Sequence, residues 1–278
     1  MWAFINDKLI PAEEATIPVG DLAIQRGYAV FDFFRTAETV PLFIDDHLER
    51  LARSAKALRL PVKYSADEWK AIIRELLQKN GLSSSGIRIT VTGGTSPDTY
   101  TPTEPNIIIT QQQLVMKGEE GFQNGLHLIT HEYVRDLPAI KTINYLMGVW
   151  LQQKVKVAGA DDILYVKNGY ISELPRSNIF VVSYDGTLST PSSNILEGIT
   201  RKQVLRLSKS LLPAMECDIS MNDLIKSSEV FVTSTTKRLL PVLSINGQKI
   251  GEGKPGPVTK ALYNSFLELE QKEIARGW

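Results

Sequence analysis

The sequence has few of the side chains that bind metals or form disulfides. It contains one cysteine, Cys217, and three scattered histidines, His47, His127 and His131. A single cysteine cannot close an internal disulfide, and the histidines fall in no metal-binding spacing such as HExxH or paired CxxC. The sequence therefore predicts neither a disulfide scaffold nor a metal site.

Long apolar runs and an excess of charge of one sign are also missing. No stretch approaches the roughly 18 apolar residues of a membrane span, and the first residues lack the basic start and apolar stretch of a secretory leader. The 31 lysines and arginines balance 31 aspartates and glutamates. Without a net basic field, nucleic acids and anionic membranes are poor partners. We expect a cytoplasmic protein that acts on small molecules.

Two glycine-rich strings match nucleotide-binding motifs only as strings. Residues 251–256 fit GxGxxG, but the chain ends before a second strand and an acidic residue can follow. Residues 81–86 have the glycine spacing of a P-loop, but Ile87 and Arg88 replace the lysine and hydroxyl that such a loop needs. Neither string predicts a nucleotide site.

The chain does contain an ordered mixture of short strands and helices, without an internal repeat. Its 278 residues suffice for about two domains. Helical spacing predicts helices near residues 48–58, 69–77, 145–158, 200–212 and from Pro257 onward. Apolar runs and turn signals predict strands at residues 4–6, 8–11, 41–43, 87–92, 106–110, 126–130, 163–166, 170–173, 178–182, 187–189 and 229–234. These elements predict two α+β domains, with residues 111–125 as the best candidate for a linker.

Three segments have features that suit a phosphorylated ligand. Residues 198–201 form a glycine turn that opens an amphipathic helix, and the free amides of a helix start attract phosphate. Residues 233–236 are four consecutive hydroxyls at a predicted strand end. Arg50 lies outside the apolar stripe of its helix and offers a two-pronged donor. Each feature alone is also explained by an ordinary helix start, a hydroxyl turn or a solvated arginine.

One lysine interrupts an apolar segment just before a predicted helix. Lys141 stands between Ile140 and Ile143. Burial disfavours the charged form of a lysine, which suits Schiff-base chemistry. On its own, the pattern is more typical of a structural lysine whose stem alone is buried.

Together these segments resemble the fold-type IV family of pyridoxal phosphate (PLP) enzymes. This family includes D-amino-acid aminotransferases, branched-chain aminotransferases and aminodeoxychorismate lyases. The resemblance covers nearly the whole chain. Its six segments, in the family's order and spacing, are residues 140–145, 159–162, 171–180, 195–201, 229–236 and 253–259.

The resemblance implies an α+β, two-domain PLP fold of type IV, like that of D-amino-acid aminotransferases. It implies a small N-terminal α/β domain at residues 1–114, a linker at 115–125 and a larger C-terminal domain at 126–278 with a barrel-like sheet. Pyridoxal 5′-phosphate would lie between the domains. The family also implies a homodimer in which the partner completes each site.

The resemblance also implies roles for single residues. Lys141 would hold pyridoxal phosphate as a Schiff base and move a proton at the substrate Cα, and Glu173 would face the pyridine nitrogen. Asn178 would order the loop that carries Glu173. The other implied cofactor contacts are Arg50, the amides of Ile199 and Thr200, Thr235 and Ser234 at the phosphate, Leu196 at the ring face and Tyr145 at the phenolic oxygen.

The sequence departs from the family where the substrate carboxylate should bind. Familiar D-amino-acid enzymes use an Arg-x-His that follows Gly-Thr-Ser-Pro, and this chain keeps residues 94–97 but continues with Asp-Thr-Tyr. A buried anion needs a partner. We expect Arg88 to bind it, assisted by Arg26 or Arg35, with Thr236 as a further substrate contact. A role for Arg26 in bracing its own turn is the alternative.

The resemblance leaves several activities open. Residues 93–97, Asn178 and residues 231–236 favour a D-amino-acid transaminase, which is the function we expect. Tyr145 and residues 253–259 favour a branched-chain L-amino-acid aminotransferase, and an aminodeoxychorismate lyase would share every cofactor residue. A phosphate-binding protein without catalysis is disfavoured, because it would need neither a lysine nor a carboxylate at these positions.

Overall fold

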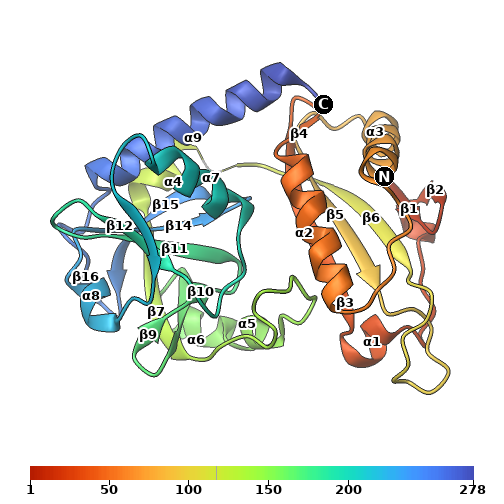
Figure 1. The fold of residues 1–278 in the computed structure, drawn as a ribbon, viewed down its shortest axis with the longest axis horizontal. Helices are drawn as coiled ribbons and strands as arrows, with labels where there is room; N and C mark the ends of the chain where they lie inside the picture. Colours follow the sequence, from red (N-terminus) through yellow and green to blue (C-terminus); the bar gives the residue numbers. More distant parts are fainter. Residues whose placement is uncertain (117) are drawn as a thin grey trace. The chain divides into compact units, whose positions relative to one another are not determined.

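The computed structural model describes residues 1–116 and 118–278, which divide into two compact units (Figure 1). Unit 1 consists of Met1–Val115, Ile140–Asn144 and Lys272–Trp278, and unit 2 of Met116–Ala139 and Tyr145–Gln271. Within the described ranges, no helix is long and apolar enough to cross a membrane.

Unit 1 is an antiparallel sheet with the strand order β2-β1-β6-β5-β3-β4. Two helices, α2 and α3, pack on one face of it. The elements are β1 (Trp2–Ile5), β2 (Lys8–Pro11), the 3-10 turn Ala12–Glu14, α1 (Leu22–Arg26), β3 (Ala29–Ala37), β4 (Val40–Pro41), α2 (Ile44–Ala57), α3 (Ala66–Asn80), β5 (Ser85–Thr92) and β6 (Ile107–Gln113).

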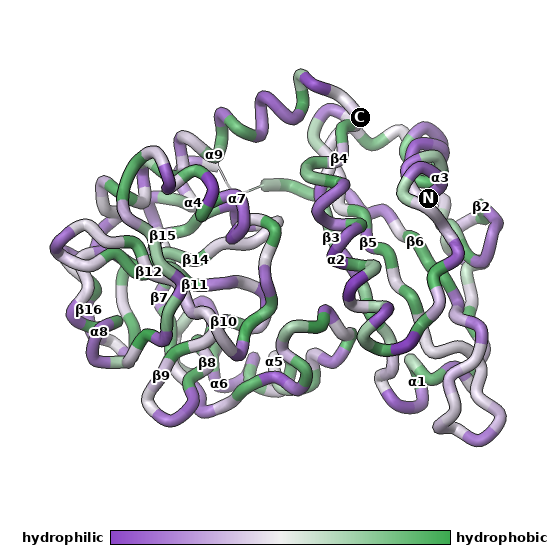
Figure 2. The backbone as a smooth tube through the Cα atoms, viewed as in Figure 1, coloured by the Kyte–Doolittle hydropathy of each residue, from purple (hydrophilic) through white to green (hydrophobic). Residues whose placement is uncertain are grey.

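The core of unit 1 follows from its residue periodicity. Along β5, Ile87, Ile89 and Val91 alternate with more polar residues and are fully buried against the helices. Figure 2 shows the corresponding alternation of hydrophobic and hydrophilic residues along α2. A reciprocal cap between Ser65 and Glu68 starts α3, and Gly81 ends it in a left-handed conformation. The predicted helices at 48–58 and 69–77 are confirmed as α2 and α3.

The strand β3 was not predicted from the sequence, and it carries much of the candidate site. Val30 and Phe34 point into the helix-covered core. Because side chains alternate along a strand, Phe31, Phe33 and Arg35 lie on the opposite face. Arg88 of β5 is paired with Phe33 and therefore shares that face.

Unit 2 contains a ten-stranded mixed sheet that curls rather than lying flat (Figure 1). Its main path is β13-β12-β11-β14-β15-β7-β8-β9, with β10 paired to β11 and β16 to β15. The elements are α4 (Glu119–Asn124), β7 (Leu126–Glu132), α5 (Leu146–Trp150), α6 (Gln152–Val157), β8 (Asp162–Lys167), β9 (Tyr170–Ile171), β10 (Glu173–Leu174), β11 (Ser177–Val182), β12 (Leu188–Pro191), α7 (Ile199–Ser208), β13 (Ala214–Cys217), α8 (Met221–Ile225), β14 (Glu229–Ser234), β15 (Arg238–Ile245), β16 (Gln248–Lys249) and α9 (Pro257–Arg276).

A carboxylate from the sheet fixes the start of α9. Glu229 accepts hydrogen bonds from the Val258 amide at 3.0 Å, the Thr259 amide at 2.8 Å and the Thr259 hydroxyl at 2.7 Å. A Cβ on Gly256 would lie 2.0 Å from the carboxyl carbon of Glu229, so only glycine fits there. Residues 253–259, one of the six segments that resemble the family, thus form the cap of a helix.

The boundaries of the units differ from the domain limits drawn on the sequence at 1–114, 115–125 and 126–278. Residues 140–144 belong to unit 1 because the Phe31 amide donates to the Lys141 carbonyl at 2.9 Å and the Ile143 amide to the Ala29 carbonyl at 3.1 Å. The stretch taken as a linker at 115–125 is not irregular throughout, since it includes all of α4.

Candidate active site

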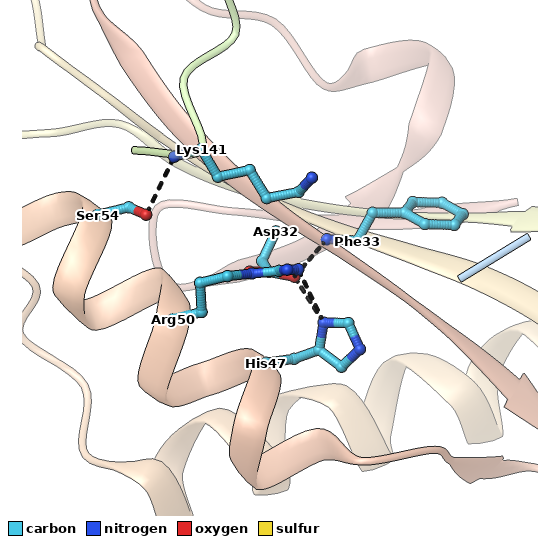
Figure 3. A network of polar contacts seen from close by, with 6 residues as sticks. All are labelled: Asp32, Phe33, His47, Arg50, Ser54 and Lys141. Carbon is cyan, nitrogen blue, oxygen red and sulfur yellow. Dashed lines mark hydrogen bonds and ion pairs between the residues drawn. The ribbon is translucent and has the colours of Figure 1, made fainter. Parts of the chain in front are cut away.

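Lys141 is held by its backbone between α2 and β3 of unit 1 (Figure 3). Its amide donates to the Ser54 hydroxyl at 3.2 Å, and its carbonyl accepts from the Phe31 amide. Its Nζ lies 4.6 Å from the centre of the Phe31 ring. The lysine predicted for Schiff-base chemistry therefore starts from a fixed backbone position, with its amine against an aromatic ring.

Arg50 lies beside this segment, and its guanidinium is turned into the protein. Its Nε donates to Asp32 Oδ2 at 2.9 Å and its Nη2 to Asp32 Oδ1 at 2.9 Å, a bidentate ion pair. Arg50 is 4% exposed and Asp32 1%. The solvated surface arginine that the sequence allowed as an alternative is thus wrong.

Asp32 is a site residue that sequence reasoning missed. Burial raises the pKa of this carboxyl, but Arg50 and His47 together outweigh burial and hold the pKa well below its ordinary value. The His47 Nδ1 lies 2.7 Å from Asp32 Oδ1, and the Phe33 amide donates to the same oxygen at 2.8 Å. Asp32 is therefore a permanent anion whose oxygens are occupied by protein donors.

Arg88 and Lys141 meet at the same aromatic ring. The Arg88 Cζ lies 3.7 Å from the centre of the Phe31 ring, the ring that Lys141 Nζ also contacts. Arg35 is buried on the same face of the sheet, paired with Gly86 across β5. The structure thus places Arg88 and Lys141 each in contact with the Phe31 ring, and Arg35 further along the same strand face.

Arg26, the third candidate for the substrate carboxylate, braces a loop. Its Nη1 donates to the Gln25 carbonyl at 2.8 Å and its Nη2 to the Thr99 hydroxyl at 2.9 Å. Its guanidinium also lies 5.0 Å from the centre of the Tyr100 ring. Asp98 orders the same loop by accepting from two amides and two hydroxyls. These contacts match the bracing alternative for Arg26.

Unit 2 holds the predicted carboxylate Glu173 in a buried ion pair. Its Oε1 accepts from Arg135 Nε at 2.6 Å and its Oε2 from the Leu196 amide at 2.9 Å. Glu173 is 4% exposed, so it is not a solvent-facing strand residue. Arg135 was missed from the sequence: it stands close to the Lys141 segment, but only the fold reveals a partner 38 residues away.

The loop between β12 and α7 ends at a helix start that has no side-chain cap. Asn178 is paired with Glu173 across the ladder and donates to the Leu196 carbonyl at 2.7 Å. A Cβ on Gly198 would lie 2.1 Å from Asn178 Oδ1, so glycine permits this approach. Gly198 is the N-cap of the ten-residue α7, whose first amides belong to Ile199 and Thr200. Such amides are suited to an anion.

The remaining predicted contacts are also in unit 2. Ser234 ends β14, and its hydroxyl accepts from the Lys237 amide at 3.2 Å, as in an ordinary hydroxyl turn. Thr235 and Thr236 lie in the turn that follows. Tyr145 is the half-buried N-cap of α5. Among the described residues, no cluster of three or more histidine, cysteine or acidic side chains is arranged to hold a metal.

Known proteins resemble this chain along most of its length. Residues 29–245 match the family model described as amino-transferase class IV. The chain is 32% identical over 286 residues to the D-alanine aminotransferase of Bacillus licheniformis, covering 99% of this chain and 100% of that protein. It is 32% identical over 297 residues to the branched-chain-amino-acid aminotransferase of Salmonella typhimurium, covering 100% and 95%.

A solved structure agrees with these matches. The branched-chain amino acid aminotransferase of T.th., solved with pyridoxamine 5′-phosphate, has a TM-score of 0.89 to this chain at 29% identity. The match covers 96% of this chain and 93% of that one. The fold is therefore shared along almost the whole chain.

Proposed function

The chain belongs to the class IV aminotransferases, with the type IV fold, and from that premise we propose that it binds pyridoxal 5′-phosphate and transfers the amino group of a D-amino acid to a 2-oxo acid. The observation that carries the proposal is that Lys141 and Arg88 both contact the Phe31 ring. An amine and a guanidinium on one ring suit the nitrogen and the carboxylate of an amino acid.

The donor set fits the cofactor. Unit 1 supplies a lysine for its aldehyde and Arg50 for its phosphate, and unit 2 supplies Glu173 for the pyridine nitrogen and the start of α7 for the phosphate. The cofactor, when bound, supplies an electron sink for the charge left at the substrate Cα. A relative solved with pyridoxamine 5′-phosphate supports this assignment.

Within this set, each side chain has a definite task. Lys141 Nζ would remove the proton from the substrate Cα and later return a proton as the amino group is transferred. One group would thus act as both general base and general acid. Glu173, which is paired with Arg135, would accept a hydrogen bond from the pyridine nitrogen of the cofactor. Leu196 is positioned by its own backbone bonds to Glu173 and Asn178.

Arg88 is the proposed ligand of the substrate carboxylate. It replaces the Arg-x-His that this chain lacks, and its position on the Phe31 ring supports the assignment. Arg35 assists from the same face of the sheet, while Arg26 serves the loop at Thr99. Thr236 stays a prediction. Arg88→Ala should raise the Michaelis constant of every amino donor at least tenfold, whereas the exposed Arg59→Ala should not.

The D enantiomer is favoured by relatives that are D-alanine aminotransferases. The segment 253–259, which had favoured the branched-chain L-amino-acid enzymes, caps α9 in this structure. The branched-chain alternative retains Tyr145 and a relative of equal identity in its favour. The lyase alternative is consistent with the same fold and stays open to the screen below.

A donor screen tests the proposal. The purified protein, loaded with pyridoxal phosphate, is offered D- and L-alanine, glutamate and leucine, with 2-oxoglutarate or pyruvate as acceptor. Amino transfer from D-donors alone is the expected result. Transfer from L-leucine and L-glutamate instead would establish the branched-chain function. Pyruvate release without an acceptor, from aminodeoxychorismate, would establish the lyase.

The homodimer is also a proposal. Leu146, Val149 and Trp150 of α5 are each more than two-thirds exposed, and exposed apolar side chains that gather on one helix are typical of an interface. Sedimentation of the wild-type protein should give a dimer, and Trp150→Glu should shift it toward monomer. A wild-type monomer would contradict the proposal. The cytoplasmic location stays a prediction from the sequence.

A further inference from the structure

Three buried polar side chains lie along one face of α2. His47, Arg50 and Ser54 are three and four residues apart, which places them in line on a helix. All three are buried among otherwise apolar neighbours. Ser54 accepts a hydrogen bond from the Lys141 amide and Arg50 donates to Asp32 (Figure 3). The proposed function assigns no role to His47.

The hydrogen-bond chemistry defines the state of His47. The Asp32 carboxylate can only accept, so at 2.7 Å the His47 Nδ1 must carry the proton and donate it. Arg50 Nη2 lies 3.4 Å from the same nitrogen. The two groups are close because both donate to Asp32 Oδ1. Burial lowers the pKa of His47, with Asp32 opposing and Arg50 and Lys141 reinforcing this effect. Burial thus favours the neutral form of the ring.

Asp32 in turn defines the orientation of Arg50. Two of the five guanidinium N–H groups are engaged by the two oxygens of Asp32, so one edge of the planar fork is fixed. A planar group fixed along one edge has its other edge fixed as well. The orientation of the whole Arg50 guanidinium therefore depends on how firmly Asp32 itself is held.

The same two elements hold the lysine. In β3, the Phe31 amide donates to the Lys141 carbonyl, and the residue after Phe31 is Asp32. In α2, the Ser54 hydroxyl accepts from the Lys141 amide, and Ser54 lies one turn after Arg50. Figure 3 shows the side chains of Lys141 and Arg50 extending in the same direction from these backbones. The lysine and the arginine are thus placed by one common frame.

We infer that His47 is a positioning residue for the cofactor phosphate. By holding Asp32 in place, His47 fixes the orientation of the Arg50 guanidinium and its position relative to Lys141. The inference rests on the proposed function, in which Arg50 binds the phosphate. His47 touches neither cofactor nor substrate in this account.

The test compares binding of pyridoxal 5′-phosphate and pyridoxal to the full-length chain after cofactor removal. Both compounds offer the same ring and aldehyde, so the dissociation constant of pyridoxal divided by that of pyridoxal 5′-phosphate is a ratio that isolates the contribution of the phosphate. His47→Leu removes the donor and should lower this ratio about tenfold, the usual worth of a charge-assisted hydrogen bond. His47→Asn retains a donor near the position of Nδ1 and should keep the ratio within about threefold of wild type.

Two further variants guard against a merely structural effect. Thr36→Val removes a buried hydroxyl that bonds Ser85 on the same face of β3 and should leave the ratio unchanged. His47→Gln displaces the amide by one methylene and should lower the ratio as His47→Leu does, which keeps the test valid if the leucine variant does not fold. In an Arg50→Gln background, His47→Leu should have no additional effect.

The outcomes separate the inference from its premise. If Arg50→Gln lowers the ratio but His47→Leu and His47→Gln do not, the positioning role is overturned and the proposed function stands. If His47→Leu still lowers the ratio in the Arg50→Gln background, the histidine acts by another route and the inference is also overturned. If Arg50→Gln itself leaves the ratio unchanged, the phosphate assignment in the proposed function is wrong.

Discussion

Unit 1 and unit 2 each contain a buried arginine–carboxylate pair that includes a predicted site residue, and the proposed roles within the two pairs are opposite. In unit 1, Arg50 is the proposed ligand of the phosphate and Asp32 orients it. In unit 2, Glu173 is the proposed partner of the pyridine nitrogen and Arg135 orients it. A buried ion pair is a weak source of net stability. Both pairs are better explained by orientation, because in each pair one member holds the charged group of the other in a fixed position.

The difference lies in what else each pair contacts. Asp32 accepts only from residues of α2 and from its own strand, so the first pair is part of the packed layer between helix and sheet. Glu173 also accepts from the Leu196 amide, so the second pair is tied to the loop that leads to α7. Damage to the first pair should therefore affect folding most, and damage to the second pair should affect catalysis most.

The largest expected effect is on the stability of the Asp32→Asn variant. It leaves the buried guanidinium of Arg50 without its counter-charge, which should lower the free energy of unfolding by about 3–5 kcal/mol. Denaturant unfolding followed by circular dichroism measures this. Asp7→Asn is the matched control, because Asp7 pairs with Lys63 at an exposed position, and it should cost less than about 1 kcal/mol. Equal losses in the two variants would contradict the account.

The second prediction concerns the ligand-binding member of the other pair. Glu173→Gln keeps the shape of the side chain but removes the charge that we propose to face the pyridine nitrogen, so kcat should fall on the order of 100-fold. Steady-state transamination measures it. Glu216→Gln breaks a comparable pair with Arg201 at a half-exposed carboxylate and should stay within about twofold of wild type. A loss for both variants alike would argue against a specific role.

The third prediction concerns the orienting member. Arg135→Gln retains the Glu173 carboxylate but loosens it, so kcat should fall by about tenfold, less than for Glu173→Gln. Arg135→Lys restores a cation without the bidentate fork and should recover part of the loss. If Arg135→Gln were as damaging as Glu173→Gln, the division into a ligand member and an orienting member would not hold for unit 2.

The smallest expected effect is a pH dependence of stability in unit 1. Burial lowers the pKa of His47 in the folded state, against the opposing Asp32 and together with Arg50 and Lys141. The unfolded state therefore binds more protons once the pH falls below about 6.5, and folding loses stability there by up to about 1.4 kcal/mol per pH unit. Unfolding at pH 7.5 and 5.5 should show a flatter dependence for His47→Asn than for wild type. An identical dependence would show that His47 does not titrate in this way.

The sequence predicted the ligand members of the two pairs but not the orienting members. Lys141, Arg50 and Glu173 could be named from local pattern and family resemblance. Asp32 and Arg135 could not, because their partners are 18 and 38 residues away and only the fold brings them together. The strand that carries Asp32 was itself missed: almost every residue of β3 is buried, so it lacks the alternation that marks a half-exposed strand.

Other differences have equally local causes. β15 was missed because Pro241 lies inside it, paired with Phe231, and proline is a poor indicator of a central strand. The predicted helix at 145–158 is divided at Leu151 into α5 and α6. The start of α9 at Pro257 is confirmed. The role of Glu229 in capping it depends on a contact nearly 30 residues away and could not be predicted.

The most direct test of the central claim is to locate the cofactor chemically. The loaded protein is reduced with borohydride, digested and analysed by mass spectrometry, with and without prior incubation with D-alanine or L-alanine. The account predicts a phosphopyridoxyl mass on Lys141 that D-alanine removes, because the amino group has then been transferred to the cofactor, and that L-alanine leaves in place. Modification of a different lysine, or removal by L-alanine alone, would contradict it.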